Sequence, residues 1–268
     1  MRGMKARILF LGDTYADSNY TVMGDTSATV ANPTAPHRMM NTSSYAVLIE
    51  HPEAGWILFD TGVADDWQTS VPQHMLDAVR LEKPENTRMD YHLKQLGLKP
   101  EDISHVVISH MHYDHIGNNK LFADTADFYV PRAEAEAVFC MMFQSRNPVD
   151  YGFYVREDVL LPVKSMTHID QDMELFPGID VVLLPGHSPC VMGMVLHLEG
   201  GTIIFPSDAV NVQRNYDGLM PGGVYDSVSW RKSVQKVKSL QKQYQAQVFF
   251  PHDKEQLNTM KKSPEYYE

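Results

Sequence analysis

Residues 110–117 read HMHYDHIG and come directly after a β-like run, His105–Ser109. Three imidazoles and a carboxylate so close together would be hard to bury in a core, because each polar group would need its own partner. At the end of a strand the same side chains can turn toward one point, and Gly117 permits the sharp turn that follows. Because imidazole and carboxylate groups are common zinc ligands, this stretch predicts a metal-binding loop.

Further candidate ligands stand at the ends of other predicted strands. His187 follows Ile179–Leu184, Asp208 follows Thr202–Phe205, and His252 follows Gln247–Phe250. Proline or glycine flanks each of these turns. One loop cannot supply all the ligands of two metal ions. Four strands that present metal-binding side chains at one edge therefore predict a shared, larger site.

The rest of the chain alternates short strands with a few helices. Helices are predicted over Asp90–Leu96, Ala133–Phe143 and Ser227–Tyr244, the last with apolar residues at helical spacing. Besides those already named, strand-like runs cover Arg7–Gly12, Ser44–Glu50, Trp56–Asp60, Asp127–Val130 and Met192–Leu198. Since helices fall between groups of strands, we expect two packed sheets with helices outside, an αββα sandwich. A single domain over residues 1–268 is predicted, because no linker divides the chain.

Two long stretches, Asp13–Thr42 and Gln144–Thr167, lack a regular pattern. Loops of this length are usually functional or pack as arms on a neighbour, although ordinary surface insertions fit the sequence equally well. The first stretch contains His37. It leads to the hypothesis of an arm that covers the active site or a partner subunit, as in a homodimer.

The overall composition limits the classes of protein to which the chain can belong. The chain has 268 residues, of which 43% are hydrophobic, and a formal net charge of −11. A packed core is therefore expected, and a nucleic-acid partner is not. No apolar stretch is long enough to predict a membrane span, and the short run Ile8–Leu11 does not predict a signal peptide. Cys140 and Cys190 lie outside any CxxC motif, which favours a reducing cytoplasm over a disulfide framework.

The metal-ligand candidates, taken in order, resemble the ligand pattern of the metallo-β-lactamase superfamily. Asp60-Thr61-Gly62 resembles its early Asp-Thr-Gly segment, and the resemblance covers nearly the whole chain. It implies that Asp60 supports the metal loop and that Asp208 bridges two metals. One metal would be held by His110, His112 and His187. The other would be held by Asp114, His115 and His252. Two Zn²⁺ ions are expected, and iron, manganese or cobalt would fit the same ligand types.

Such a site predicts hydrolysis. Asp114, Asp208 and a bridging hydroxide would neutralise three of the four charges of two zinc ions, and the remaining charge favours an anionic tetrahedral intermediate. Asp114 and Asp208 are therefore catalytic candidates as well as ligands. Two metals that share a water can activate it near neutral pH. Attack by a metal-bridging hydroxide then needs no separate strong base.

Within the superfamily the chain looks most like the lactonase branch that includes N-acyl-homoserine lactonases and pyridoxolactonase. Its length, the strand Tyr45–Glu50 followed by Trp56–Gly62, and the ending around His252-Asp253 carry this resemblance. It implies a small lactone substrate, such as an N-acyl-homoserine lactone, with quorum quenching or catabolism as the role. Hydrolysis of a thioester, an aryl ester or a phosphate ester is the alternative, because the metal chemistry is shared.

One position departs from that branch. Those lactonases place a tyrosine three residues after the bridging aspartate, where this chain has Asn211. Asparagine can donate a hydrogen bond but cannot act as a phenolic acid. Asn211 and the nearby Tyr216 are therefore both candidates to contact the substrate.

Methionine and aromatic residues gather in and beside the irregular stretches, and such side chains form adaptable apolar walls. One hypothesis is that they line a pocket for an acyl chain. The alternative is that they belong to the ordinary core or to a dimer contact. The residues concerned are Met23, Met39, Met40, Met141, Met142, Phe143, Tyr151, Phe153 and Tyr154.

Overall fold

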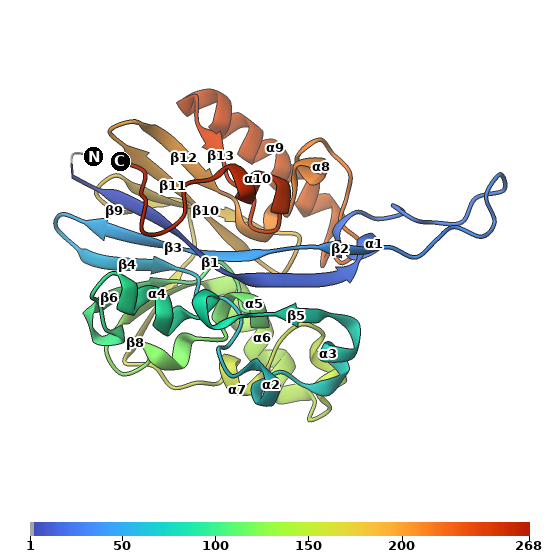
Figure 1. Ribbon diagram of the computed structural model, residues 1–268, viewed down its shortest axis with the longest axis horizontal. Helices are drawn as coiled ribbons and strands as arrows, with labels where there is room; N and C mark the ends of the chain where they lie inside the picture. The colour runs from blue at the N-terminus through green and yellow to red at the C-terminus, as the bar shows by residue number, and fades with distance from the viewer. Residues whose placement is uncertain (1–2) are drawn as a thin grey trace.

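The computed structural model describes residues 3–268. Two β-sheets lie face to face, and helices cover the outer face of each (Figure 1). The predicted αββα sandwich is confirmed. Because each sheet is covered on both sides, its central strands are continuously apolar rather than alternating, and Ala46–Ile49 are all fully buried.

The first sheet contains the N-terminal strands of the chain. They are β1 (Lys5–Asp17), β2 (Met39–Asn41), β3 (Ser44–His51), β4 (Gly55–Phe59), β5 (Arg80–Glu82), β6 (Ile103–Val107), β7 (Asp127–Pro131) and β8 (Ser165–Ile169). Their order is β2-β1-β3-β4-β6-β7-β8, with β5 paired to β1. Neighbours are antiparallel from β2 to β4 and parallel from β4 to β8.

The second sheet contains the later strands. They are β9 (Met173–Phe176), β10 (Ile179–Leu184), β11 (Val191–Leu198), β12 (Gly201–Phe205) and β13 (Gln247–Val248). Their order is β13-β12-β11-β10-β9, and only the β12–β13 pair is parallel. Between the sheets, Ile8 and Ile57 from the first sheet share one buried cluster with Met194 and Phe205 from the second.

Three longer helices form the outer layers. α4 (Met89–Gln95) and α6 (Arg132–Gln144) pack on the first sheet. α9 (Ser227–Tyr244) packs on the second through Trp230, Val234 and Val237. These three helices match the predicted ones to within one residue at each end. No helix within residues 3–268 has the length and apolarity needed to cross a membrane.

The remaining helices are single turns or little more, placed in the connections between strands. The α-helices are α1 (Ser18–Thr21), α2 (Trp67–Ser70), α3 (Gln73–Ala78), α5 (Tyr113–Ile116), α7 (Arg156–Val159), α8 (Gln213–Tyr216) and α10 (Lys254–Thr259). The 3₁₀ helices are η1 (Glu85–Thr87), η2 (Pro100–Asp102), η3 (Asn119–Leu121), η4 (Pro148–Tyr151) and η5 (Ser207–Ala209).

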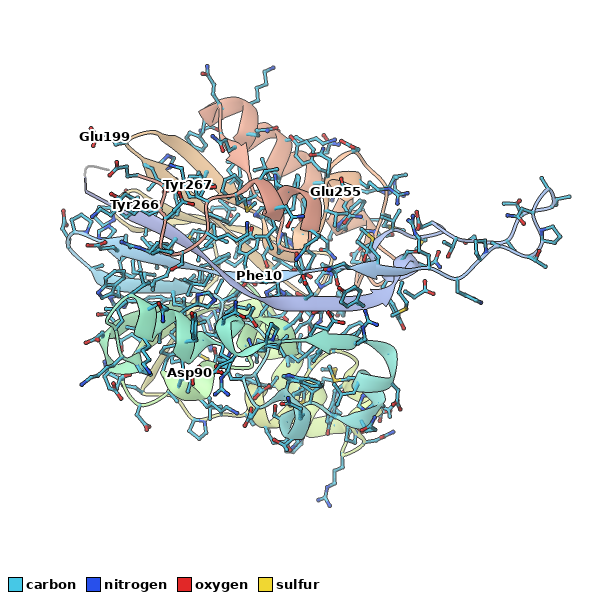
Figure 2. The ribbon with its side chains drawn as sticks, in the orientation of Figure 1. Phe10, Asp90, Glu199, Glu255, Tyr266 and Tyr267 are labelled. Atoms are coloured by element: carbon cyan, nitrogen blue, oxygen red, sulfur yellow. The ribbon has the colours of Figure 1, made fainter. Side chains whose placement is uncertain are left out.

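The first irregular stretch is more regular than predicted. β1 continues to Asp17 because its far end pairs with both β2 and β5. Between β1 and β2, residues 23–38 form an arm that projects from the body of the molecule (Figure 1). The side chains of this arm extend into solvent (Figure 2), and Val30 is fully exposed. The second stretch contains η4, α7 and the start of β8.

The C-terminal segment returns to the start of the chain. The backbone N–H of Tyr267 donates to Ala6 and that of Ala6 donates to Tyr267, at 2.9 and 2.8 Å. The ring of Tyr266 lies 5.2 Å from the guanidinium of Arg7. Figure 2 labels both tyrosines beside β1. This segment therefore covers one end of the inter-sheet core, against which Tyr267 packs.

Candidate metal centre

All seven predicted ligands lie together at one edge of the sandwich, in the segments that follow β6, β10, β12 and β13. Their ligand atoms form overlapping groups in which all atoms lie within 4.8 Å of one another. We call His110, His112 and His187 the three-histidine cluster. We call Asp114, His115 and His252 the acidic cluster. A third group, His110, His115 and Asp208, connects the two.

Asp208 lies between the two clusters. Its Oδ1 is 3.1 Å from Nε2 of His115 and 3.2 Å from Nε2 of His252. Its Oδ2 is 3.4 Å from Nε2 of His187. Each carboxylate oxygen thus faces a different cluster, which is the arrangement that a bridging ligand requires.

The spacing of the three-histidine cluster fits one metal ion. Nδ1 of His112 lies 3.0 Å from Nε2 of His110 and 3.1 Å from Nε2 of His187. Nitrogen ligands about 2.0–2.1 Å from one tetrahedral zinc ion would lie roughly 3.3 Å apart. The three rings therefore already converge as ligands do.

The two clusters differ in electrostatics. Burial lowers the pKa of His110 and His112 well below the usual histidine value, which favours the neutral imidazoles that bind metals. Burial also opposes a charged His115, but the carboxylates of Asp208 and Asp114 outweigh it and raise its pKa well above the usual value. The acidic cluster therefore concentrates negative charge that a divalent cation would neutralise.

Buried polar atoms without hydrogen-bond partners indicate whether the site is suited to metal ions. Nε2 of His115 and Oδ1 of Asp208 are buried and lie 3.1 Å apart, yet neither makes a hydrogen bond, which is rare for buried polar atoms. Nδ1 of His252 faces the carbonyl oxygen of Ser43 at 3.1 Å. Nδ1 of His115 faces Asp60 at 2.8 Å. Both rings are thus oriented from behind with Nε2 toward the site, as metal-ligating histidines are, and the residues fit a metal pair.

Asp60 lies beneath the metal loop, directly after β4. Its Oδ1 accepts a hydrogen bond from the backbone N–H of Ser109, and its Oδ2 accepts one from the Ser109 hydroxyl, both at 2.7 Å. The same Oδ2 faces the His115 ring. These contacts support the role that the resemblance implied for Asp60.

Gly186 allows His187 to reach the site. Its φ is +133°, and a Cβ at this position would lie 2.2 Å from the backbone nitrogen of Trp230 on α9. The turn after β10 therefore approaches the outer helix so closely that only glycine fits.

Five of the seven ligand candidates, all except His110 and His115, line a pocket whose apolar wall includes Ala16, Tyr20, Val79 and Phe153. The Phe153 ring lies 5.7 Å from the His112 ring and 6.1 Å from the Tyr20 ring. An apolar group held against this wall would lie directly beside the metal ligands.

Of the methionine and aromatic residues expected in this wall, only Phe153 is there. Four of the others, Met141, Met142, Tyr151 and Tyr154, pack in or against the core beneath the first sheet. Met39 and Met40 line a separate hollow, and Met23 and Phe143 are exposed. The hypothesis of a methionine-rich pocket is therefore wrong.

The two substrate-contact candidates have different surroundings. Asn211 lines the pocket, and its side-chain Oδ1 is buried without a hydrogen-bond partner. The Tyr216 hydroxyl instead donates to Gln241 on α9, and its ring packs 5.8 Å from the Phe250 ring. Tyr216 therefore does not belong to the candidate site, because α8 directs it toward the outer layer.

One residue at the site was missed from the sequence. Glu134 on α6 is fully buried and accepts hydrogen bonds from the loops that carry the three-histidine cluster. In the sequence it resembles Glu136, whose side chain is 66% exposed. No local pattern distinguishes the two residues, because only the tertiary packing of α6 decides which of them is buried.

Comparison with known proteins agrees with this geometry. The family model described as the Metallo-beta-lactamase superfamily matches residues 40–252, which contain every ligand candidate. The chain belongs to the metallo-beta-lactamase superfamily. It is a hydrolase of that superfamily with a metal-binding cluster of histidines and aspartates.

Several relatives within the superfamily are lactonases. An N-acyl homoserine lactonase of Bacillus cereus is 30% identical over 246 residues, covering 89% of this chain and 92% of the relative. The N-acyl homoserine lactonase AiiB of Agrobacterium fabrum is 28% identical and covers 99% of this chain and 100% of its own length. A solved N-acyl homoserine lactone hydrolase, with N-hexanoyl-L-homoserine bound at its catalytic metal center, superposes with a TM-score of 0.82. It is 25% identical and covers 98% of each chain.

Proposed function

We propose that this chain is a zinc-dependent lactonase that opens the ring of N-acyl homoserine lactones, with quorum quenching as its role. The observation that carries the proposal is the position of Asp208, with one oxygen toward each cluster beside an apolar wall. The lactonase relatives support the choice of substrate.

In this proposal the three-histidine cluster would hold one zinc ion, the acidic cluster would hold a second, and Asp208 would be a ligand shared between them. Bound zinc would supply an ionised water near neutral pH and polarise the lactone carbonyl. The neighbouring histidines keep Asp208 ionised, because their charge outweighs burial and holds its pKa well below the usual value. Asp208 and Asp114 offset only part of the metal charge. The remaining positive charge of bound zinc would stabilise the negative charge that develops on the carbonyl oxygen.

The protein groups around the cluster would position the substrate. Ala16, Tyr20, Val79 and Phe153 offer an apolar surface for an acyl chain and exclude water from it. The side-chain amide of Asn211 lines the pocket beside the ligands and its Oδ1 has no hydrogen-bond partner, so this oxygen is free to bond the substrate. That amide can donate to a lactone oxygen or accept from the acyl amide N–H.

The test is ring opening, followed by proton release, with zinc-loaded protein. The panel contains acyl homoserine lactones of several chain lengths, simple lactones, a thioester, an aryl ester and a phosphate ester. Acyl homoserine lactones are expected to turn over fastest, with a loss of about 100-fold or more in Asp208→Ala. Turnover of only the thioester or an ester would leave the metal site in place and reject the lactonase proposal.

We also propose a second copy of this chain as a partner. Residues 26–36 of the arm carry no charged side chain, although the chain has a net charge of −11. An uncharged segment can be buried between two acidic copies without desolvating a charge. Tyr20, Met23 and Leu219 are also exposed. The backbone N–H of Met23 donates to Met220, which places these apolar side chains near the base of the arm.

The state of the cysteines supports the predicted cytoplasmic location, which we retain as a proposal. Cys140 is exposed and Cys190 is buried, and both thiols are free. Burial raises the pKa of the Cys190 thiol to about 12, so this thiol is protonated and unreactive. An exposed free thiol such as that of Cys140 persists most readily in a reducing compartment.

A further inference from the structure

A buried carboxylate lies behind the three-histidine cluster without being one of its ligands. Glu134, in the first turn of α6, is fully buried. A buried carboxylate is unfavourable unless hydrogen-bond donors surround it, and burial raises its pKa above the usual value despite the donors present. Burying Glu134 therefore costs free energy, and the identity of its hydrogen-bond donors indicates what the burial achieves.

The donors come from the two loops that carry the cluster. Oε1 accepts from the backbone N–H of Met111 at 3.1 Å. Met111 lies between His110 and His112. Oε2 accepts from the backbone N–H of Cys190 at 3.0 Å, three residues after His187. One carboxylate thus holds both loops, which belong to different sheets.

Tyr154 completes this arrangement. Its hydroxyl donates to Oε1 of Glu134 at 3.0 Å, and the centroid of its ring lies 4.5 Å from that of His112. The ring therefore fixes the orientation of His112 while the hydroxyl fixes Glu134. Nδ1 of His112 lies 3.1 Å from Nε2 of His187, although the two loops are far apart in the chain.

The acidic cluster is oriented differently. There Asp60 bonds a ligand ring directly, through Nδ1 of His115. The hydrogen bonds that Glu134 makes with the two loops reach their backbones and no ligand side chain. The two buried carboxylates thus serve different halves of the site by different means.

We propose that Glu134 is a positioning residue that sets the distance between the two histidine loops and thereby the metal affinity of the three-histidine cluster. This inference rests on the proposed two-metal site, although it does not depend on the substrate. It assigns to Glu134 a selective effect on one of the two metals.

The test is Glu134→Gln, with Glu136→Gln on the exposed side of the same helix as the matched control. Glutamine keeps the shape but offers only one oxygen, so one of the two backbone N–H groups would face an amide NH₂ group. We expect one of two bound Zn²⁺ or Co²⁺ ions to bind about 10- to 100-fold more weakly in a chelator titration. The Co²⁺ absorption and the affinity of the other equivalent should stay unchanged. Chelator curves identical in Glu134→Gln, Glu136→Gln and wild type would overturn the proposal.

A measurement on the wild-type chain covers the case in which Glu134→Gln does not fold. Hydrogen exchange of the Met111 and Cys190 amides is followed with and without bound zinc. If Glu134 holds the loops, both amides stay protected after chelation. Rapid exchange of both amides in the metal-free protein would overturn the proposal. Neither readout uses lactone turnover, so a failed lactonase assay leaves this test intact.

Discussion

Asp60 and Ser207 have φ values of 59° and 47°, in the left-handed region that non-glycine residues seldom enter. Both contact Ser109, the residue before the metal loop. Asp60 accepts from its N–H and hydroxyl, and the Ser207 hydroxyl donates to the Ser109 hydroxyl at 2.8 Å. Backbone strain of this kind persists only where the surroundings over-determine it. Here the two strained residues contact Ser109, directly before the metal loop, so the strain lies where it can fix the positions of the candidate ligands.

Asn211 carries the first prediction at the residue scale. Asn211→Ala removes the unpartnered amide but keeps the backbone carbonyl that accepts from the His252 N–H at 3.1 Å. If the amide bonds the substrate, kcat/KM for the preferred lactone falls by about 3- to 10-fold, the value of one ordinary hydrogen bond. Steady-state kinetics at saturating zinc measures this loss.

The control is Gln213→Ala, which deletes an exposed amide two residues along, outside the pocket. It should leave kcat/KM unchanged, and both variants should retain their metals. If Asn211→Ala is as active as Gln213→Ala, the amide does not contact the substrate.

At the scale of elements, the contact between α9 and the turn after β10 carries the next prediction. Gly186→Ala places a Cβ against the backbone of Trp230 and should destabilise the fold by about 2–4 kcal/mol. It should also displace His187 and weaken zinc binding. Urea unfolding of the metal-free protein and a chelator titration measure the two effects.

Gly201 supplies a matched control, because its φ is +134° but a Cβ there would meet nothing within 4 Å. Gly201→Ala therefore introduces similar backbone strain without a clash, and about 1 kcal/mol is expected. Equal losses in the two variants would mean that backbone strain, and not the approach of α9, explains Gly186.

Elements also explain what the sequence could and could not predict. Each ligand candidate lies in a segment that directly follows a strand, so predicted strand ends located it without tertiary information. Met141 and Met142 failed as pocket residues because α6 turns them toward the core. Tyr216 failed because a contact with Gln241, far away in the chain, decides where its hydroxyl lies. The role of Glu134 could not be predicted from the sequence, because only packing between the layers buries Glu134 and leaves Glu136 exposed.

For the whole molecule, the projecting arm predicts a dimer. Val30→Asp places a charge in the uncharged part of the arm, and in a symmetric pair the change occurs in both copies. Burying these charges or placing them side by side costs several kcal/mol, so the dissociation constant of the dimer should rise at least about tenfold. Sedimentation velocity over a concentration series measures it.

Val228→Asp is the control for the arm, since Val228 is also an exposed valine, at 61%, but lies on α9. It should associate as the wild type does. A wild-type chain that sediments as a monomer throughout the series would refute the dimer, and so would a dimer unaffected by Val30→Asp.

The ligand candidates are divided between the two sheets: those of the loop after β6 belong to the first, and His187, Asp208 and His252 belong to the second. In polymer terms, ions bound here are cross-links between segments that are distant along the chain, comparable to disulfides but reversible. Unlike disulfides, such links form only in the folded chain, so they stabilise it by mass action, by an amount that grows with the free ion concentration. The lifetime of this protein against proteolysis would then follow the free zinc concentration of its surroundings, even when no substrate is present.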